Sequence, residues 1–491
     1  MRQSGASSVR AADRHGIAGF FQSIGSFFAG FVNDVRTGDV WVRLSLLVCG
    51  AGYFGRKQYV KGVIVTLVQA ALLIGFPLLL WPYLAKIGTL GTVQQEKVFN
   101  METMKNEYND YDNSFKILLF GIIALLVIAV AIVLYIRNIH NVRELQARAE
   151  SGKHVNRFGE DVGEALNGKF HTTLLTLPTL GIIVTTITPL IVMICIAFTN
   201  YDINHIVPTK LFTWVGLDNF KKLFTNSLSL TFSYAFGKVL VWTLVWSFFA
   251  TFTNYFGGIL LAMFINNKRT RGKRFWRTCF MVAIAVPQFV SLMLIRNFFS
   301  NTGIVNTICA NIGVLDLCKQ MGLVSPGMSY IPFLSDASWS KVMIILINMW
   351  IGMPYMMLIS TGVLMNIPAD LLESAKIDGA SKFQSFKSIT MPYVSFVLGP
   401  YMVSSFVNNI NNFNVIYLLQ QDVFTTSDQA LANSNAKETD LLVTWLYRLT
   451  QDYSNYKMAS AIGILIFIIC AAFTLVAFRS LTRGDKEENF Q

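Results

Sequence analysis

The sequence is poor in charged residues. Only 14% of its 491 residues are Asp, Glu, Lys or Arg, whereas 53% are hydrophobic, and the mean hydropathy is +0.48. This balance argues against a single water-soluble domain. The net charge is +12, but the basic residues lie mainly in short segments between apolar runs, which indicates membrane topology and not nucleic-acid binding. The composition predicts an all-α integral membrane protein.

Residues that build metal or catalytic sites are few and scattered. The five histidines form no His-x-x-x-His pair and the six cysteines form no Cys-x-x-Cys pair, so we expect no metal site and no catalytic centre. Residues 163–170 resemble a phosphate-binding loop, but Phe170 stands where Mg²⁺ requires Ser or Thr. If ATP drives this protein, ATP and Mg²⁺ therefore bind another chain, and we expect no cofactor on this one. Cys309 and Cys318 share one loop outside the predicted spans, where a disulfide could form; two free thiols are the favoured alternative.

Eight apolar segments are long enough to cross ~30 Å of hydrocarbon as helices. They cover residues 63–84, 115–136, 173–199, 239–265, 279–299, 342–364, 393–419 and 458–478. The apolar segment 41–54 is too short to span, and we expect it to be re-entrant or interfacial. No apolar stretch beside a small-residue cleavage site occurs in residues 1–38, so no removable signal peptide is predicted.

The charges of the loops predict which side of the membrane each loop faces. The loops at 137–172 and 266–277 are rich in Lys and Arg and should be cytoplasmic, whereas the loop at 83–114 is acid-rich. Eight spans then place both termini in the cytoplasm. The predicted segments are an interfacial N-terminus (1–60), an additional helix pair (61–136), a basic cytoplasmic linker (137–172), a six-helix core (173–478) with a cytoplasmic loop (366–392), and a cytoplasmic tail (479–491).

Two of the spans carry polar stripes. The first stripe follows spacings of three, one and three: Asn348, Ile351, Gly352 and Tyr355. The second follows spacings of four, three and four, widened by Asn409 and Asn411: Tyr401, Ser405, Asn408 and Asn412. Such spacings place side chains on one helical face. Amides and rings without buried charge suit a neutral polyhydroxylated ligand. Hydrogen bonding between helices is the alternative for any single asparagine, but two matched stripes favour a ligand site.

A polar interruption separates these two spans. It reads Glu373, Ser374, Ala375, Lys376, Ile377, Asp378, Gly379 and Ala380, and Ile389-Thr390-Met391-Pro392 follows after nine residues. A helix, a glycine turn and a second helix presented to a soluble partner are expected, the alternative being an ordinary amphipathic interfacial loop. The spacing resembles the "EAA" loop of importer permeases of the ATP-binding-cassette (ABC) class, from which Ser374 and Met391 depart. The resemblance implies docking of this loop on an ATPase subunit: Glu373 and Asp378 contact the ATPase, Gly379 permits the turn, and Pro392 stiffens entry into the next span.

The C-terminal part of the chain is similar to the larger permease subunit of maltose and maltodextrin importers. The similarity is carried by residues 285–287, 348–357, 399–400, 411–413 and 439–443. It implies a type I importer core and sugar contacts at Asn348, Ile351, Gly352, Tyr355, Asn408, Asn409 and Asn412. Asn408 departs from the enteric member, which has an aromatic residue there. The short segment 200–238 and residues 50–62 resemble the permeases of Gram-positive bacteria, which receive substrate from a lipid-anchored binding protein.

The resemblance therefore implies a non-enzymatic subunit of an ATP-driven importer for maltodextrin or related oligosaccharides in a bacterial cell membrane. Expected partners are a second homologous permease, two ATPase subunits as a homodimer or heterodimer, an extracytoplasmic sugar-binding lipoprotein, the sugar and membrane lipid, without nucleic acid. A secondary transporter or facilitator for a neutral polar solute is the main alternative, although internal repeats and ionisable groups at the midplane are missing. A membrane enzyme would need a clustered acid, base or metal site, and a sensor or scaffold without transport stays open.

Overall fold

The computed structural model is almost entirely helical, and it describes residues 17–101, 104–225, 231–267, 269–420 and 426–482. Within these ranges the only strands are β1 (Lys97–Asn100) and β2 (Lys105–Tyr108), which form one antiparallel hairpin. The predicted helical fold class is confirmed. Most of the predicted tail, from residue 483 onward, lies outside the described residues.

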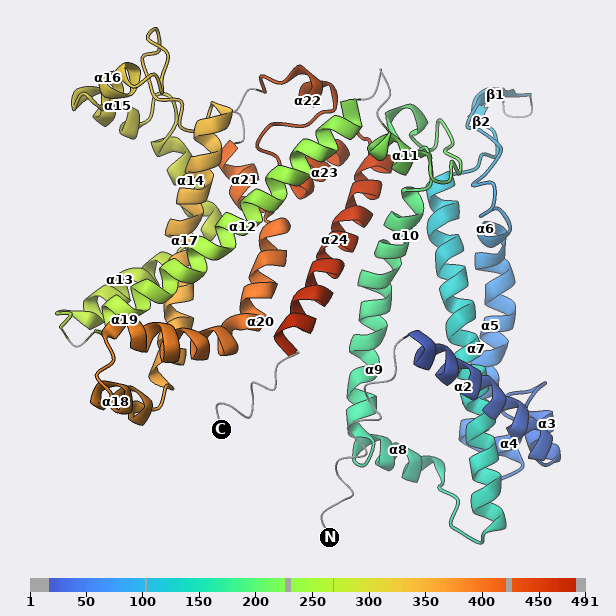
Figure 1. The fold of residues 1–491 in the computed structure, drawn as a ribbon. Helices are drawn as coiled ribbons and strands as arrows, with labels where there is room; N and C mark the ends of the chain where they lie inside the picture. Colours follow the sequence, from blue (N-terminus) through green and yellow to red (C-terminus); the bar gives the residue numbers. More distant parts are fainter. Residues whose placement is uncertain (1–16, 102–103, 226–230, 268, 421–425, 483–491) are drawn as a thin grey trace. The chain divides into compact units, whose positions relative to one another are not determined.

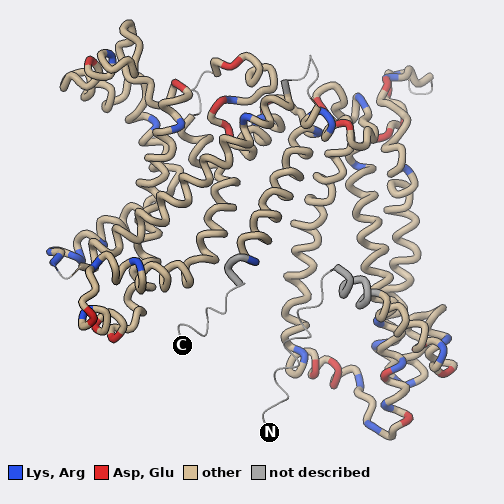
Figure 2. The backbone as a smooth tube through the Cα atoms, viewed as in Figure 1, with Lys and Arg blue, Asp and Glu red and all other residues tan. Residues whose placement is uncertain are grey.

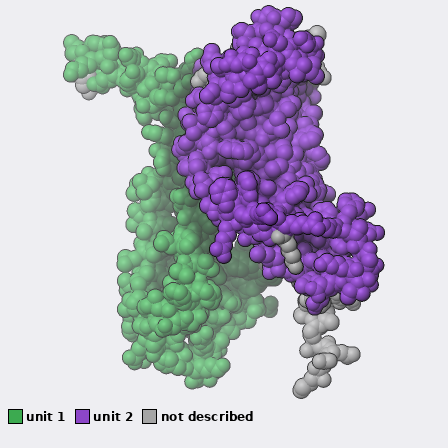
Figure 3. Space-filling model, turned by 90° about the vertical axis from the view of Figure 1, so that its left-hand side faces the viewer, with its two compact units in different colours: residues 1–195, 204–214 green, residues 196–203, 215–491 purple. Residues whose placement is uncertain are grey.

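Internal contacts divide the chain into two compact units, coloured separately in Figure 3. Unit 1 contains residues 1–195 and 204–214, and unit 2 contains residues 196–203 and 215–491. The segment 173–195, which the sequence-based division assigns to the core, therefore groups with the N-terminal spans by its contacts. The functional boundaries of the five predicted segments stay predictions.

Six helical segments of the described chain are long and apolar enough to cross a membrane, or up to seven if a bent pair counts as one more. They are Tyr59–Ala85, Ser114–Glu150, Phe170–Ile196, Phe232–Asn266, Ala337–Met365 and Tyr456–Arg479. Each coincides with a predicted span. Large apolar side chains on them point outward, and Leu73, Ile74 and Leu78 keep about two thirds of their surface exposed. Lipid, and not water, suits such surfaces.

Unit 1 is built from short N-terminal helices and three long ones (Figure 1). In chain order it contains α2 (Ile17–Thr37), α3 (Val40–Leu44), α4 (Ala51–Phe54), α5 (Tyr59–Gly75), η1 (Phe76–Leu80), α6 (Trp81–Ala85), α7 (Ser114–Glu150), α8 (Phe158–Leu166), α9 (Phe170–Ile182), η2 (Ile183–Ile187) and most of α10 (Thr188–Ile196). The segment predicted as re-entrant or interfacial folds as the short helices α3 and α4, neither of which can span.

Unit 2 is organised around α12, which packs along α17 and crosses α20. Its helices are α11 (Asp218–Phe224), α12 (Thr231–Asn266), α13 (Lys273–Ala285), α14 (Gln288–Phe298), α15 (Ile304–Asn311), α16 (Val314–Gln320), α17 (Ala337–Met365), α18 (Ala369–Ile377), α19 (Lys382–Ser385), η4 (Phe386–Thr390), α20 (Met391–Ile410), α21 (Phe413–Gln420), α22 (Gln429–Asn433), α23 (Leu442–Gln451) and α24 (Tyr456–Thr482). The 3-10 turn η3 (Ile203–His205) lies at the boundary of the two units. The core of unit 2 includes the fully buried Trp246, Ile344 and Val415.

Two predicted spans are not continuous helices. The segment 279–299 bends by 94° between α13 and α14, because Pro287 forces the preceding Val286 into an extended conformation. The segment 393–419 breaks after Ile410. There the Asn411 side chain donates to the Val407 carbonyl (3.1 Å), and the Asn412 side chain accepts from the Val415 amide (3.3 Å) at the start of α21. Asparagine side chains that bond to the backbone in this way compete with helix propagation.

A proline follows each of the three π-helical segments of the described chain. Pro82, Pro189 and Pro392 each stand two residues after the end of η1, η2 and η4, respectively. Proline has no N–H to donate to the carbonyl four residues earlier, and its ring crowds that carbonyl. That carbonyl lies inside the π segment in all three cases, so local widening of the helix relieves the conflict.

Charged residues gather at helix ends and connecting segments, and long stretches of the helices have none (Figure 2). Uncharged stretches of this length suit helices that lie in the hydrocarbon core of a bilayer. All six cysteines are free thiols, so Cys309 and Cys318 are not joined, in agreement with the favoured alternative.

Candidate functional site

The polar interruption between α17 and α20 folds as a helix, a tight turn and a second helix at one end of unit 2 (Figure 1). α18 ends in a left-handed glycine: Gly379 has φ +79°. The Gly379 amide donates to the Lys376 carbonyl (3.1 Å), and the Ala380 amide donates to the Ala375 carbonyl (2.9 Å). This is a Schellman motif, in which glycine is favoured because other residues rarely adopt positive φ.

The second helix of the loop begins with a capping box directly after that turn. The Ser381 amide donates to the Gln384 side chain (2.8 Å), and the Gln384 amide donates to the Ser381 hydroxyl (3.2 Å). Both helix ends are therefore satisfied locally. The hydrogen bonds that define the turn are therefore all local to the loop.

The loop presents its predicted coupling residues to the outside. Glu373, Ser374, Asp378, Gly379 and Pro392 are exposed, while Ala375 and Ala380 are half-buried beside the turn. Three large apolar side chains of the loop are also exposed: Leu371 at 46%, Ile377 at 86% and Phe383 at 71%. A small surface that combines exposed apolar and acidic side chains suits docking of a protein partner.

The first polar stripe lies on α17, where it meets α12. Asn348 is 95% buried, since its exposed fraction is 5%, and its side-chain nitrogen has no hydrogen-bond partner among the described residues. One turn later, Gly352 lies against the side chain of Asn254 of α12. The buried side-chain oxygen of Asn254 also lacks a partner. A buried donor and a buried acceptor left unpaired cost stability, which makes this part of α12 and α17 a candidate ligand site.

The second polar stripe on α20 is used mainly to join helices. The Asn409 side chain donates to the Thr251 hydroxyl of α12 (2.9 Å), and the Trp246 ring nitrogen donates to the Asn409 carbonyl (3.1 Å). Asn412 donates to the Asn409 side chain (3.3 Å) and lies beyond the end of α20. Asn408 is exposed, and so is Asn411, whose side chain bonds to the Val407 carbonyl. Asn409 therefore forms a hydrogen bond between helices in this structure, which was the alternative to a ligand contact, whereas the exposed Asn408 is available to a ligand.

An aromatic pair connects the two stripes. The rings of Tyr355 on α17 and Tyr401 on α20 lie 6.2 Å apart at 44°. Tyr355 is 49% exposed, and Ile351 next to it in the stripe is half-buried. The structure thus brings one member of each stripe together and leaves an accessible ring beside the unpaired amides.

Sequence reasoning did not single out α12 as a contributor. Polar residues recur along this helix at spacings of four, four and three: Thr243, Ser247, Thr251 and Asn254. That periodicity was a readable signal of one polar face. Among the described residues, no group of three or more His, Cys, Asp or Glu side chains could hold a metal ion.

Comparison with known proteins now identifies the family. The model of the family described as "Binding-protein-dependent transport system inner membrane component" matches residues 254–484. The maltodextrin transport system permease protein MalC of Streptococcus pneumoniae is 33% identical over 445 residues, covering 90% of this chain and 96% of MalC. The chain belongs to this family of ABC importer permeases. The predicted resemblance is confirmed, and the permease is a multi-pass membrane protein.

Two other relatives differ in how much of the permease they match. The galactooligosaccharides transport system permease protein GanP of Bacillus subtilis is 34% identical to the permease over 444 residues, covering 90% of the permease and 97% of GanP. The maltose/maltodextrin permease protein MalF of Escherichia coli is 32% identical over only 269 residues, covering 54% of the permease and 48% of MalF. The predicted likeness to the Gram-positive forms is thereby confirmed.

The fold has a counterpart of known structure. A chain of a bacterial alginate ABC transporter, solved in complex with an alginate pentasaccharide-bound periplasmic protein, superposes with a TM-score of 0.50 at 22% identity, covering 67% of the permease and 98% of that chain. At this identity the likeness supports the fold of the permease alone.

Proposed function

We propose that the permease imports maltodextrin or related oligosaccharides and forms the transport path together with a second, homologous permease. The single observation that carries this proposal is the pair of unsatisfied amide groups on Asn348 and Asn254, beside the exposed ring of Tyr355. A neutral sugar supplies both hydroxyl donors and hydroxyl acceptors for amides, and aromatic rings pack on its apolar faces. The names of relatives such as MalC and GanP agree with an oligosaccharide substrate.

In this proposal the contacts to sugar come from Asn348, Ile351, Gly352 and Tyr355 of α17, with Asn408, Asn409 and Asn412 at the end of α20, and we add Asn254 of α12. An extracytoplasmic sugar-binding lipoprotein delivers the substrate. Both termini are cytoplasmic. The sugar acts on the transport cycle only through its different affinities for the two states of the path.

Two ATPase subunits, a homodimer or a heterodimer, bind ATP and Mg²⁺ in this proposal and dock on the loop of residues 373–392. Glu373, Ser374, Ala375, Asp378, Gly379, Ala380 and Pro392 form the coupling set. The exposed Ile377 and Phe383 add apolar contact area to it. Movement of the ATPases reaches α20 through the short helix that precedes Pro392.

Co-purification tests the proposal. The permease, extracted gently from its native membrane, should carry an ATPase and a second permease with it, and its vesicles should take up maltotriose only with ATP. In the Gly379→Val variant the ATPase should be lost, because a β-branched residue resists φ +79°. Gly379→Asn is the matched control, since asparagine tolerates positive φ and nothing lies within 4 Å of the added β-carbon.

Two results would contradict this function. A lone chain that transports after ATP depletion would indicate a secondary transporter. If Gly379→Val couples ATP hydrolysis to uptake as the wild type does, ATPase docking does not depend on this turn of the loop.

A further inference from the structure

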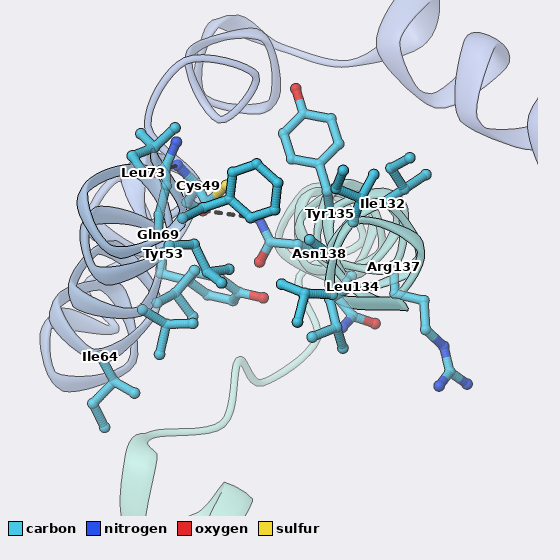
Figure 4. Close-up of a pocket in the computed structure, with 18 of the residues that line it drawn as sticks. Cys49, Tyr53, Ile64, Gln69, Leu73, Ile132, Leu134, Tyr135, Arg137 and Asn138 are labelled. Atoms are coloured by element: carbon cyan, nitrogen blue, oxygen red, sulfur yellow. Dashed lines mark hydrogen bonds between the residues drawn. The ribbon is translucent and has the colours of Figure 1, made fainter. Parts of the chain in front are cut away.

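Unit 1 contains a cavity of about 1090 Å³, and none of the residues proposed for sugar or ATPase contact lines it. It lies between α5 and α7, and its walls are mostly aliphatic side chains of these two helices. Figure 4 shows Gln69 and Leu73 of α5 on one side of the space and Ile132 and Tyr135 of α7 on the other. All residues that line it belong to unit 1.

The turn between α3 and α4 lies beside this cavity and contributes Cys49 to its wall. The Gln69 side chain of α5 donates to the Leu47 carbonyl (2.8 Å) and accepts from the Cys49 amide (2.8 Å). From α7, the Asn138 side chain donates to the Cys49 carbonyl (2.9 Å) and the Tyr135 hydroxyl donates to the Leu46 carbonyl (2.9 Å). The turn is thus bound to both helices at once.

The cavity is long enough to hold a lipid acyl chain. Its lining runs from Ile64 of α5 to Pro77 of η1, and from Val127 to Asn141 of α7. At a rise of ~1.5 Å per residue these stretches measure roughly 20 Å and 21 Å. Half of the hydrocarbon core of a bilayer is about 15 Å thick, so one acyl chain would fit along them.

Two basic residues, Arg137 and Lys169, also line the cavity. Lys169 forms an ion pair with Glu164 at 2.9 Å. Arg137 is exposed, and neither an ion pair nor a hydrogen bond of its side chain is found among the residues that the structure describes; in Figure 4 its guanidinium extends outward at the rim. A mostly apolar space long enough for an acyl chain, with cations at its rim, is complementary to an anionic lipid.

We propose that this cavity binds one anionic glycerophospholipid, with an acyl chain between α5 and α7 and its phosphate beside Arg137 and Lys169. The lipid fills the space between α5 and α7 and holds the two helices together. This proposal is independent of the sugar and of the ATPases.

Photocrosslinking of the intact permease in nanodiscs tests it. Phosphatidylglycerol with a diazirine in its acyl chain should label peptides that contain residues 64–76 and 127–137, and the same probe built on phosphatidylcholine should label them several-fold less. Replacing Arg137 and Lys169 by Gln should lower phosphatidylglycerol labelling about fivefold for each charge removed and leave phosphatidylcholine labelling unchanged.

Three further variants keep the result interpretable. Arg137→Lys keeps the charge and should retain labelling. Lys153→Gln removes an exposed cation from the segment between α7 and α8, outside the cavity, and should have no effect on labelling. The pair Val68→Phe and Ala131→Leu fills the space and should reduce labelling by both probes, even if the charge variant fails to fold.

Equal labelling by the two probes would overturn the proposal, because the cavity would then hold any lipid. An equal loss in Lys153→Gln would overturn it as well, since the charge effect would be general. A protein–protein crosslink from these peptides to the second permease, in place of a lipid adduct, would also overturn the proposal, because a protein segment would then occupy the cavity.

Discussion

Gly352 of α17 lies directly against the side chain of Asn254 of α12. A β-carbon at position 352 would come within 2.3 Å of the Asn254 side-chain nitrogen, far inside any tolerated contact. The absence of a side chain at Gly352 therefore lets α12 approach α17 at the level of the unpaired amides.

Gly352→Ala should displace the Asn254 amide from its position between the two helices. We expect a loss of about 1–3 kcal/mol in stability, as for other overpacked interiors, together with reduced sugar uptake. The measurement is the midpoint of detergent-induced unfolding of the purified permease. Gly362→Ala on the same helix is the control, because nothing lies within 4 Å of its added β-carbon and alanine favours helix over glycine; equal losses in both variants would argue against the close contact.

Asn348→Ala and Asn409→Ala should differ in their effect on stability. Among the described residues the Asn348 side-chain nitrogen has no hydrogen-bond partner, so its removal should leave stability nearly unchanged while uptake falls at least tenfold. Asn409 bonds to Thr251, so its removal should cost ~0.6–2 kcal/mol, the range for bonds between membrane helices. A double-mutant cycle with Thr251→Ala should recover that coupling. Unchanged uptake in Asn348→Ala would remove this residue from the sugar site.

Pro392→Ala should remove the π segment η4. The new amide can donate to the Ser388 carbonyl, so the helix should return to α geometry and rotate the coupling loop by roughly 100°, the angle of one residue. We expect slower hydrogen exchange in peptides covering residues 382–396 and weaker coupling of ATP hydrolysis to uptake. Pro400→Ala, within α20 and without a π segment, is the control and should preserve coupling.

The ion pair between Lys238 and Asp428 should make the stability of the permease depend on pH in the acid range. The Lys238 ammonium (2.5 Å) and then the Tyr234 hydroxyl (2.9 Å) bond to the Asp428 carboxylate, and they lower the pKa of Asp428 to about 2. A lowered folded-state pKa means that this stabilisation is complete above pH ~4, the unfolded value, and is lost as pH falls through about 2.

Thermal unfolding of wild type and Asp428→Asn at several pH values checks this. The difference between them should be present at pH 7, shrink below pH ~4, and be reduced by salt because the pair is partly exposed. Asp316→Asn serves as control, since Asp316 is 72% exposed and its contact with Lys319 is 3.8 Å. A difference that does not change with pH would mean that the carboxylate charge contributes nothing.

The sequence by itself determined the features that depend on neighbouring residues. The length of apolar runs located the six confirmed spans, and the pattern of Gly379 followed by a polar segment predicted a turn between two helices. Local backbone preference and local hydrogen bonds decide such features. The break at Pro287 was equally local, and it was missed because hydropathy averages over the residue that bends the chain.

Only the tertiary structure decided which polar groups have partners. Asn348 and Asn409 look alike in the sequence, but one is unpaired and the other bonds to Thr251. The role of Asn254 and the cavity between α5 and α7 likewise depend on contacts between residues distant in the chain. Periodicity fixes the face on which a side chain lies; the packing of one helix against another, which no local pattern encodes, fixes what that face meets.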